Sequence, residues 1–573
     1  MSLVLDSHTV FASLDHRTGP WLEEEEARAI AHVYRIRSRF NAVVPSIARL
    51  PPEVLLEIFS WVHLAEDSHM DTRWIAVSQV CQRWRNIAVS KPSLWSRLAP
   101  WSGEFLSLCA ARSGNHPLTF QWENDDAKYK MLLAYSSRCS SINVTLGEPG
   151  VMEQFTSDFC NAAQPWSQLE SMTIELDEEK SEIDSPSFPK FLCTPDMLPS
   201  FPRLQFLSLT NVFPSLWTTI SVHGKSLRTL RLFNGSVNVE RAPLTSFWDM
   251  LSSLPMLEEL FMAYVPTAYL LPEGVTAYTE PERTVNLSRL RILRVDMPCS
   301  SDMAYLLSPL QFPDTAVLHI ERWDRETEDS VLAVFPRDLL RLSSYLNSIE
   351  TVQLARTTDE LGIDSVALVA YRSNVPCSRI FAHCPSDSDS AMIPMVLRNS
   401  LLQLTHVFQA LTALELCLHS FNVRGITSSE WVEIFRTLSS CLKMLTFIGS
   451  DLNDQARTAR DIEDLRFFLR FFTEHATSGL LEVSGMEDSS EPLRDTILPH
   501  LVRLDLVNLE QSVQATLRED VLKYLSSRKA ASLPSTCEMY FESERWDVES
   551  ESGTHATPST PPLISEFPDP VSV

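Results

Sequence analysis

The hydrophobic positions at the beginning of the chain follow helical spacing. Across residues 21–40 the apolar side chains recur at intervals of three and four, which predicts one long helix. Glutamates fill positions 23–26, and arginines stand near the opposite end, so the charges at each end complement the helix dipole. We expect residues 1–45 to comprise a flexible start and this helix, and we expect the helix to support the module that follows rather than to lie on a membrane surface. Its apolar residues are Leu22, Ile30, Val33, Tyr34 and Ile36.

A second group of apolar residues, in residues 46–100, predicts three short helices. Pro51 and Pro52 suit the start of the first helix, because the amides that prolines lack would have no helical partner there. The apolar faces of the three helices contain Val54, Leu55, Ile58, Phe59 and Val62, then Val77, Val80, Cys81, Trp84, Ile87 and Ala88, then Leu94, Trp95 and Leu98. Modules of about 50 residues bury too little surface to cover so many large side chains. Some of this apolar surface is therefore expected to meet a partner.

From residue 101 to residue 536 a short pattern, L-x-x-L-x-L, recurs, and its alternating apolar positions predict strands with one buried face. Helical stretches precede several of these strands, which favours stacked units that share one core. We expect a small all-helical module followed by an irregular, leucine-rich-repeat-like α/β solenoid. An ordinary α/β domain with leucine-rich strands is the alternative. The pattern occurs in QLESMTIEL, RLQFLSLTN, SLRTLRLFN, MLEELFMAY, RLRILRVDM, SIETVQLAR, ALTALELCL, CLKMLTFIG and HLVRLDLVN.

Residues 537–573 are rich in Ser, Pro, Thr and acidic residues and show no periodicity, which predicts a disordered tail. The hydrophobic content of 44% suits a folded chain elsewhere. The 48 Lys and Arg against 74 Asp and Glu leave a net charge of −26, which disfavours nucleic acid as a partner. Charged and amide side chains interrupt the most apolar later stretch, from Leu401, so no membrane span is expected. The beginning of the sequence lacks the layout of a secretory signal, and the eleven scattered cysteines contain no C-x-x-C pair, so we expect a location in the cytoplasm or nucleus.

The motifs of common enzyme classes are missing from the sequence. With only 14 glycines, none two positions from another, the chain has no glycine-rich phosphate loop and no nucleophile elbow. No two histidines stand four apart, which excludes the usual zinc helix. Cys377, His383 and Cys384 are a weak metal candidate, because two of the three are adjacent and a fourth ligand is missing. We expect no cofactor and no catalytic residue, although a carboxylate pair assembled from distant positions would leave no motif.

The segment from Ala48 to Leu98 resembles the F-box, a module whose pattern is Leu-Pro-x-Glu, then aliphatic residues, then Val-Cys-x-x-Trp and a closing Leu-Trp. The matching positions are Leu50, Pro51, Glu53, Leu55, Ile58, Phe59, Val80, Cys81, Trp84, Leu94 and Trp95. The stretch from His63 to Arg73 makes the first connection longer than is usual in the family. The resemblance implies binding to a Skp-family adaptor and, through it, to a cullin. The residues predicted to build or support that surface are Leu50, Pro51, Pro52, Leu55, Ile58, Phe59, Val80, Cys81 and Trp84.

Each of these residues has a second interpretation, as core of the module. Core packing is the stronger alternative for Cys81 and Trp84, which are expected in the middle of a helix, whereas Leu50 and Pro51 are the better candidates for direct contact. The resemblance implies that the protein is a substrate-recognition adaptor of a ubiquitin ligase, in which the later region recruits an unknown protein target. The alternative is a scaffold that binds proteins without delivering a target. A hydrolase within the later region has no supporting motif.

Overall fold

The chain divides into two units, and each is described by itself. The first comprises Met1–Thr173 with Pro199–Phe201, and the second comprises Ile174–Leu198 with Pro202–Val573. The computed structural model describes residues 19–43, 46–64, 73–99, 102–123, 133–146, 166–176, 201–210, 220–221, 224–233, 244–264, 282–322, 330–358, 364–383, 392–417, 425–449, 455–481, 498–507, 511–530, 538–541 and 544–546.

The first unit begins with helices and continues into a small parallel sheet. The predicted long helix is present as α2, and the three predicted short helices correspond to α3, α4 and the 3₁₀ turn η3. Val77, expected in the second helix, lies in η2, and Leu98, expected in the third, lies in β1. Strands β1, β2 and β3 pair side by side in parallel. The elements are α2 (Gly19–Val43), η1 (Ser46–Arg49), α3 (Pro52–Leu64), η2 (Arg73–Ser78), α4 (Gln82–Val89), η3 (Pro92–Trp95), β1 (Arg97–Leu98), α5 (Gly103–Arg112), β2 (Leu118–Glu123), η4 (Ser136–Arg138) and β3 (Cys139–Leu146).

The second unit alternates strands with helices. Strand β4 (Ser171–Leu176) begins in the first unit and ends in the second. Its remaining elements are β5 (Phe206–Thr210), η6 (Gly224–Ser226), β6 (Thr229–Phe233), α9 (Leu244–Ser252), β7 (Glu259–Ala263), β8 (Val285–Asn286), β9 (Ile292–Met297), α10 (Ser300–Leu307), β10 (Leu310–Gln311), β11 (Val317–Arg322), η7 (Val331–Val334), α11 (Ser343–Leu346), β12 (Thr351–Thr358), β13 (Asp364–Arg372), β14 (Val375–His383), α12 (Met392–Val407), β15 (Ala413–Cys417), α13 (Ser428–Leu438), β16 (Met444–Ile448), α14 (Gln455–Leu481), β17 (Arg503–Val507), α15 (Gln511–Ala530), β18 (Glu538–Phe541) and β19 (Glu544–Trp546).

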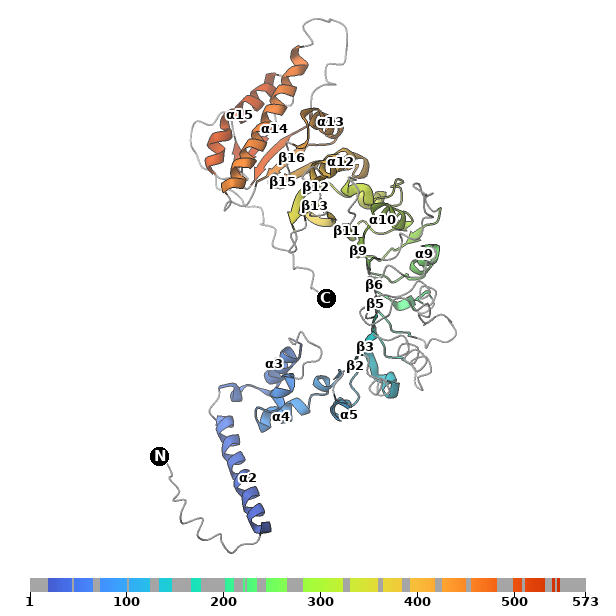
Figure 1. Ribbon diagram of the computed structural model, residues 1–573, viewed down its shortest axis with the longest axis vertical. Coiled ribbons are helices and arrows are strands. Elements are labelled where there is room, and N and C mark those ends of the chain that lie inside the picture. Colours follow the sequence, from blue (N-terminus) through green and yellow to red (C-terminus); the bar gives the residue numbers. More distant parts are fainter. Residues whose placement is uncertain are drawn as a thin grey trace. The chain divides into compact units, whose positions relative to one another are not determined.

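A large, mostly parallel sheet is the centre of the second unit. The alternating leucines of the recurring pattern account for how the strands stack, because the strand register aligns these leucines in a row across the sheet. Leu207 pairs with Leu230, which pairs with Leu260, and the same row continues through Leu293 to Leu318. All five of these leucines are buried. Helices α9, α10 and α12 lie along one side of these strands (Figure 1). Strands thus stack through a continuous aliphatic core, which is the general arrangement that the alternating pattern predicts.

The middle of this sheet departs from the recurring pattern. β12 is a predicted strand, but it does not pair with the preceding strand β11. Instead β11 pairs with β14 in parallel, β14 and β13 are antiparallel, β13 and β12 are antiparallel, and β12 pairs with β15 in parallel. The hairpin between β13 and β14 turns at Ser373 and Asn374, whose φ angles are 46° and 66°. Two successive positive φ angles are typical of the tight turns that suit the twist of a hairpin.

The carboxyl-terminal boundary also differs from the prediction. Strand β18 pairs in parallel with β17, and β19 returns antiparallel to β18, although both lie beyond Thr536, where a disordered tail was expected. The sheet therefore continues to Trp546, because the alternating segment Glu538–Phe541 can extend an existing strand edge. Residues 547–573 lie outside the described part. Among the described residues, no helix is long and apolar enough to cross a membrane. The apolar stretch from Leu401 is divided between the end of α12 and strand β15.

Candidate functional site

Helix α3 and the residue before it contain five of the nine residues predicted to build the docking surface, and the structure divides them into two groups. Leu55 and Phe59 are buried, with exposed fractions of 0% and 1%. Pro51 and Pro52 are exposed at the start of the helix, and Ile58 is half-buried. Leu55 and Phe59 therefore lie in the interior of the module, which agrees with the second interpretation given for them, as core residues that support the surface.

The interior that receives Leu55 and Phe59 is rich in aromatic rings. The ring of Phe59 lies 5.0 Å from that of Trp84, between α3 and α4. His63, at the end of α3, stacks on Trp74 at 4.9 Å, and Trp74 meets Trp95 edge-on at 5.2 Å. Large flat side chains fill a small interior with few residues, so they compensate in part for the shortness of the module.

Two side-chain hydrogen bonds connect the helices of this module, one at Trp95 and one at Leu50. The indole Nε1 of Trp95 donates to the carbonyl of Ala88 in α4 at 2.8 Å. The guanidinium of Arg112, from α5, lies 4.2 Å from the centre of the Trp95 ring. Arg83 of α4 donates to the carbonyl of Leu50 at 2.5 Å and so fixes the chain where it enters α3. The half-buried Leu50 is thus held in place by a charged donor, which is stronger than a neutral one.

A second apolar stripe on α3 faces solvent. Val54, Ile58 and Trp61 are spaced by four and three residues and so share one face of the helix. Val54 is 42% exposed and Trp61 is 65% exposed, and Val62, beside them, is 38% exposed. Sequence reasoning missed Trp61, because the apolar positions were assigned to a single face. The spacing contained the signal. Trp61 follows Val54 by seven residues, which places the two on one face of the helix, and it follows Phe59 by two residues, which places it away from the buried face.

The prediction placed Val80, Cys81 and Trp84 in one helix, but α4 begins only at Gln82, so Val80 and Cys81 precede it and Trp84 lies in its first turn. Val80 is 54% exposed and is available for contact. Cys81 is the residue that caps α4, since its Sγ accepts a hydrogen bond from the backbone amide of Trp84 at 3.5 Å. Trp84 is half-buried and packs on Phe59. Cys81 and Trp84 therefore act at least partly inside the module, as their second interpretation predicts.

Burial lowers the pKa of His63 below its ordinary value, and the nearby charge of Arg97 lowers it further. The Nδ1 atom of His63 is buried without a hydrogen-bond partner in the described part of the chain. A histidine in such surroundings is held in its neutral form, because protonation would place a charge where it cannot be solvated. His63 is thus a pH-sensitive member of the interior and not an exposed titrating group.

The face of the large sheet opposite the leucine row carries polar and aromatic side chains. One register row contains Arg231, Phe261, Arg294, His319 and Arg379. The guanidinium of Arg231 lies 5.3 Å from the ring centre of Phe206 and 4.7 Å from that of Phe261. Glu321, in the next row, accepts from His319 at 2.8 Å and from Arg294 at 3.0 Å. The hydrogen bond from His319 is the main reason that the pKa of Glu321 is lowered.

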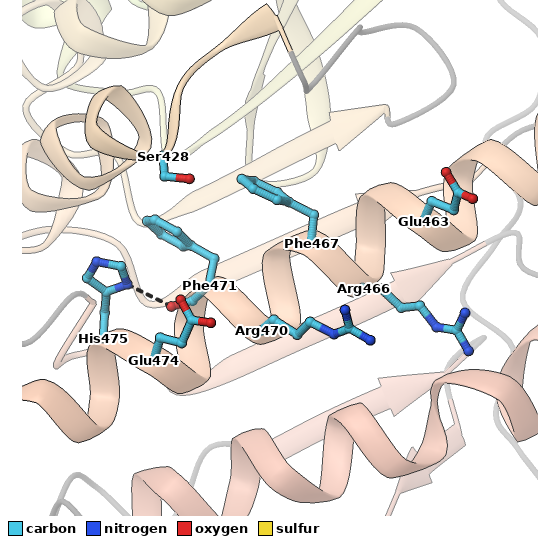
Figure 2. A pocket seen from close by; sticks show the side chains of 8 residues that line it. All are labelled: Ser428, Glu463, Arg466, Phe467, Arg470, Phe471, Glu474 and His475. Atoms are coloured by element: carbon cyan, nitrogen blue, oxygen red, sulfur yellow. Dashed lines mark hydrogen bonds between the residues drawn. The ribbon is translucent and has the colours of Figure 1, made fainter.

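A hollow of about 630 Å³ lies beside α14 in the same unit, and Figure 2 shows the side chains that line it. Phe467 and Phe471 point toward Ser428 at the start of α13 (Figure 2). Arg466 and Arg470 lie 3.5 Å and 3.8 Å from Asp520 of α15, and His475 Nδ1 contacts the carbonyl of Phe471 at 2.8 Å. The two arginines therefore connect α14 to α15 through Asp520, and the His475 contact lies within α14 itself.

The weak metal candidate separates in the structure. The thiol of Cys377 donates to the carbonyl of Ala370 at 3.4 Å, and His383 Nδ1 contacts the hydroxyl of Ser365 at 2.8 Å. Cys384 lies outside the described residues. Burial raises the pKa of the Cys377 thiol, which disfavours the thiolate that would ligate a metal. The described residues include no group of three or more His, Cys, Asp or Glu placed to hold a metal ion.

The comparisons with known proteins bear on the helical module. Residues 47–100 match the model of the F-box-like family, and this match contains α3, α4 and η3 together with the exposed stripe. The search of curated proteins found no match to this chain. The segment that sequence reasoning assigned to the F-box, Ala48 to Leu98, lies entirely within the matched residues. The first unit therefore contains an F-box-like domain, followed in the chain by a large parallel-rich sheet.

Proposed function

We propose that this protein is a substrate-recognition adaptor of a Skp-cullin-F-box ubiquitin ligase. The observation that carries the proposal is the apolar stripe on α3, with Val54 and Trp61 exposed and Ile58 half-buried between them, inside a segment that matches the F-box-like family. F-box domains in general bind Skp-family adaptors. The adaptor would cover this stripe and connect the protein to a cullin.

The stripe is large enough to matter for affinity. Burying a large apolar side chain contributes roughly 1.5–3 kcal/mol, and tryptophans are over-represented among the residues that dominate interfaces. Trp61 retains 65% of its surface in the free chain, so most of its area is still available for burial against a partner. The buried pair of Leu55 and Phe59 holds α3 in the orientation that presents the stripe.

In this proposal the second unit recruits the protein target. Its stacked strands support a leucine-rich-repeat-like interpretation, and the sheet face with Arg231 and Arg294 offers charged and aromatic groups for a protein partner. The protein itself performs no covalent step. It contributes proximity and orientation while the partner ligase transfers ubiquitin. Such a role requires no cofactor and is compatible with the cytoplasm or the nucleus.

The test is a titration of the purified full-length chain with a Skp-family adaptor. The variant combines Val54→Ala with Trp61→Ala, and Leu108→Ala is the control, because Leu108 is 40% exposed on α5 outside the stripe. The expected result is at least about tenfold weaker binding for the double variant and unchanged binding for the control. Equal binding by all three proteins, or none by the wild type, contradicts the proposal.

A scaffold that binds the adaptor without delivering a target is the second candidate. Ubiquitin conjugates on proteins that copurify with the chain separate the two, when the wild type is compared with the Val54→Ala, Trp61→Ala variant in cells. An adaptor of a ligase loses these conjugates with the variant. A passive scaffold shows the same conjugates in both.

A further inference from the structure

Helix α2 exposes an apolar stripe of its own that nothing in the described part of the chain covers. Its large apolar side chains keep between 43% and 65% of their surface: Leu22, Ile30, Val33, Tyr34, Ile36 and Phe40. The helix was expected to support the next module, yet almost all of its described side chains are exposed. Soluble proteins rarely leave a continuous apolar surface of this kind uncovered unless it binds something.

The spacing of the stripe is that of a coiled coil. Leu22, Ala29 and Ile36 are seven residues apart, and Val33 and Phe40 repeat with the same interval between them. Together they form the alternating three- and four-residue spacing of the two core positions of a heptad, interrupted once by Glu26. Leu22 to Phe40 spans about 27 Å at the helical rise, which is long enough for several layers of paired side chains.

The charges beside this stripe identify the occupant. In the same heptad frame, Glu23 and Arg37 occupy one flanking position, and Glu25 and Arg39 occupy the other. Residues at the same flanking position of the heptad face each other when two copies of a helix pair in opposite directions. Glu23 would then meet Arg37 of the second copy, and Glu25 would meet Arg39. The acidic beginning of one helix therefore complements the basic end of the other.

The core positions agree with this register. When the two helices run in opposite directions, Leu22 faces Phe40 of the second copy and Ala29 faces Val33. Glu26 then meets the aliphatic Ile36 and not a second carboxylate. Ile30 would meet its own counterpart near the two-fold axis. A parallel pairing would instead place Glu26 against Glu26 across the core and would bring no acidic flanking residue to a basic one. Buried like charges are costly, so the parallel arrangement is disfavoured.

We infer that α2 binds α2 of a second copy of this chain in an antiparallel coiled coil, so that the protein forms a two-fold symmetric dimer. A two-fold interface uses the same surface on both chains, which is why one helix can supply both the acidic and the basic half. An ion pair within the helix competes with the Glu25–Arg39 pair, because Arg28 lies 3.0 Å from Glu25, as well as 2.6 Å from Glu24. Glu23 has no such competition from Arg28, which makes the Glu23–Arg37 pair the better probe.

The mass of the full-length chain in solution tests dimer formation. Light scattering over a concentration series should give a mass that rises from 64.9 kDa toward twice that value. Val33→Glu places a carboxylate in the dimer core and should weaken association at least about tenfold. Ala31→Glu is the matched control, because Ala31 is exposed on the opposite face of the same helix. Circular dichroism of both variants verifies that the rest of the chain folds.

Charge exchange tests the direction of pairing. Glu23→Arg alone and Arg37→Glu alone each create two like-charge contacts in the antiparallel dimer, so each should weaken it several-fold at low salt. The chain that contains both substitutions restores opposite charges and should dimerise like the wild type. If both single variants and the combined variant associate equally, the antiparallel register is wrong. A monomeric wild type at all concentrations, with adaptor binding weakened by Val33→Glu, overturns the inference and assigns α2 to the adaptor.

Discussion

Replacing Phe59 or Trp61 of α3 by alanine should have very different effects on the stability of the domain, although the two residues are only two positions apart. Phe59 is 1% exposed, and its ring lies 5.0 Å from Trp84. Replacing a buried phenylalanine by alanine costs about 3–5 kcal/mol. Domains have only about 5–15 kcal/mol in total, and a module of this size lies at the low end. Phe59→Ala should therefore open the F-box-like domain for a substantial fraction of the time.

Trp61 is 65% exposed, so Trp61→Ala should change stability by no more than about 0.5 kcal/mol. Hydrogen exchange of the full-length chain, read by mass spectrometry, separates the two outcomes. A loss of about 3 kcal/mol raises the exchange rate of α3 and α4 amides by roughly a hundredfold or more in Phe59→Ala, whereas Trp61→Ala should match the wild type.

Adaptor binding then decides the interpretation of α3. Trp61→Ala should weaken binding while exchange stays unchanged, which assigns its effect to contact. Phe59→Ala should weaken binding together with faster exchange, which assigns its effect to folding. The division of α3 into a buried face and a docking face is refuted if Phe59→Ala leaves exchange protection intact, or if Trp61→Ala opens α3.

Three further predictions test other parts of the fold. The pKa of His63 is lowered in the folded chain, so the unfolded chain binds a proton at this residue first as pH falls. The stability of the F-box-like domain should therefore decrease below about pH 6.5. Hydrogen exchange measures this decrease, and His63→Gln should remove it. Thr427→Ala removes the capping box that Thr427 forms with Glu430 and should cost α13 about 1 kcal/mol, measured by denaturant unfolding. Gly224→Ala would place a Cβ atom 2.5 Å from the buried Leu254 side chain, so it should cost about 1–3 kcal/mol and lower the midpoint of thermal unfolding, whereas an unchanged midpoint would mean that Leu254 yields freely.

The sequence predicts that α3 is a helix but not which of its apolar residues face inward. Val54 and Leu55 are both aliphatic, and Ile58 and Phe59 are both apolar, so the helical period is satisfied by two adjacent stripes. The choice between them depends on Trp84 and Trp74, which belong to other elements and contact Phe59 and His63. Contacts between distant segments leave no trace in local spacing, which is why Leu55 and Phe59 were grouped with residues that are exposed.

The second unit shows the same limit at a larger scale. The recurring leucine pattern marks β12 as one more strand in the series, and β12 is indeed a strand. The pattern does not predict that β13 and β14 enter the sheet between β11 and β12, because strand pairing is decided by partners far apart in the sequence. The turn at Ser373 and Asn374 contains no glycine, so the usual hairpin signal is weak.

The limits of the family match and of the folding unit are not the same. Residues 47–100 end two residues after β1, yet β1 pairs with β2, which begins at Leu118, and the amide of Thr119 donates to the carbonyl of Ser96 at 3.0 Å. The guanidinium of Arg112, which belongs to α5 and also follows the matched residues, lies over the Trp95 ring. The sequence suggested that a partner must cover the apolar surface that three short helices cannot bury. The structure divides that surface in two: the following strands and α5 close the Trp95 end, and the stripe around Trp61 stays exposed, where we propose that the adaptor binds.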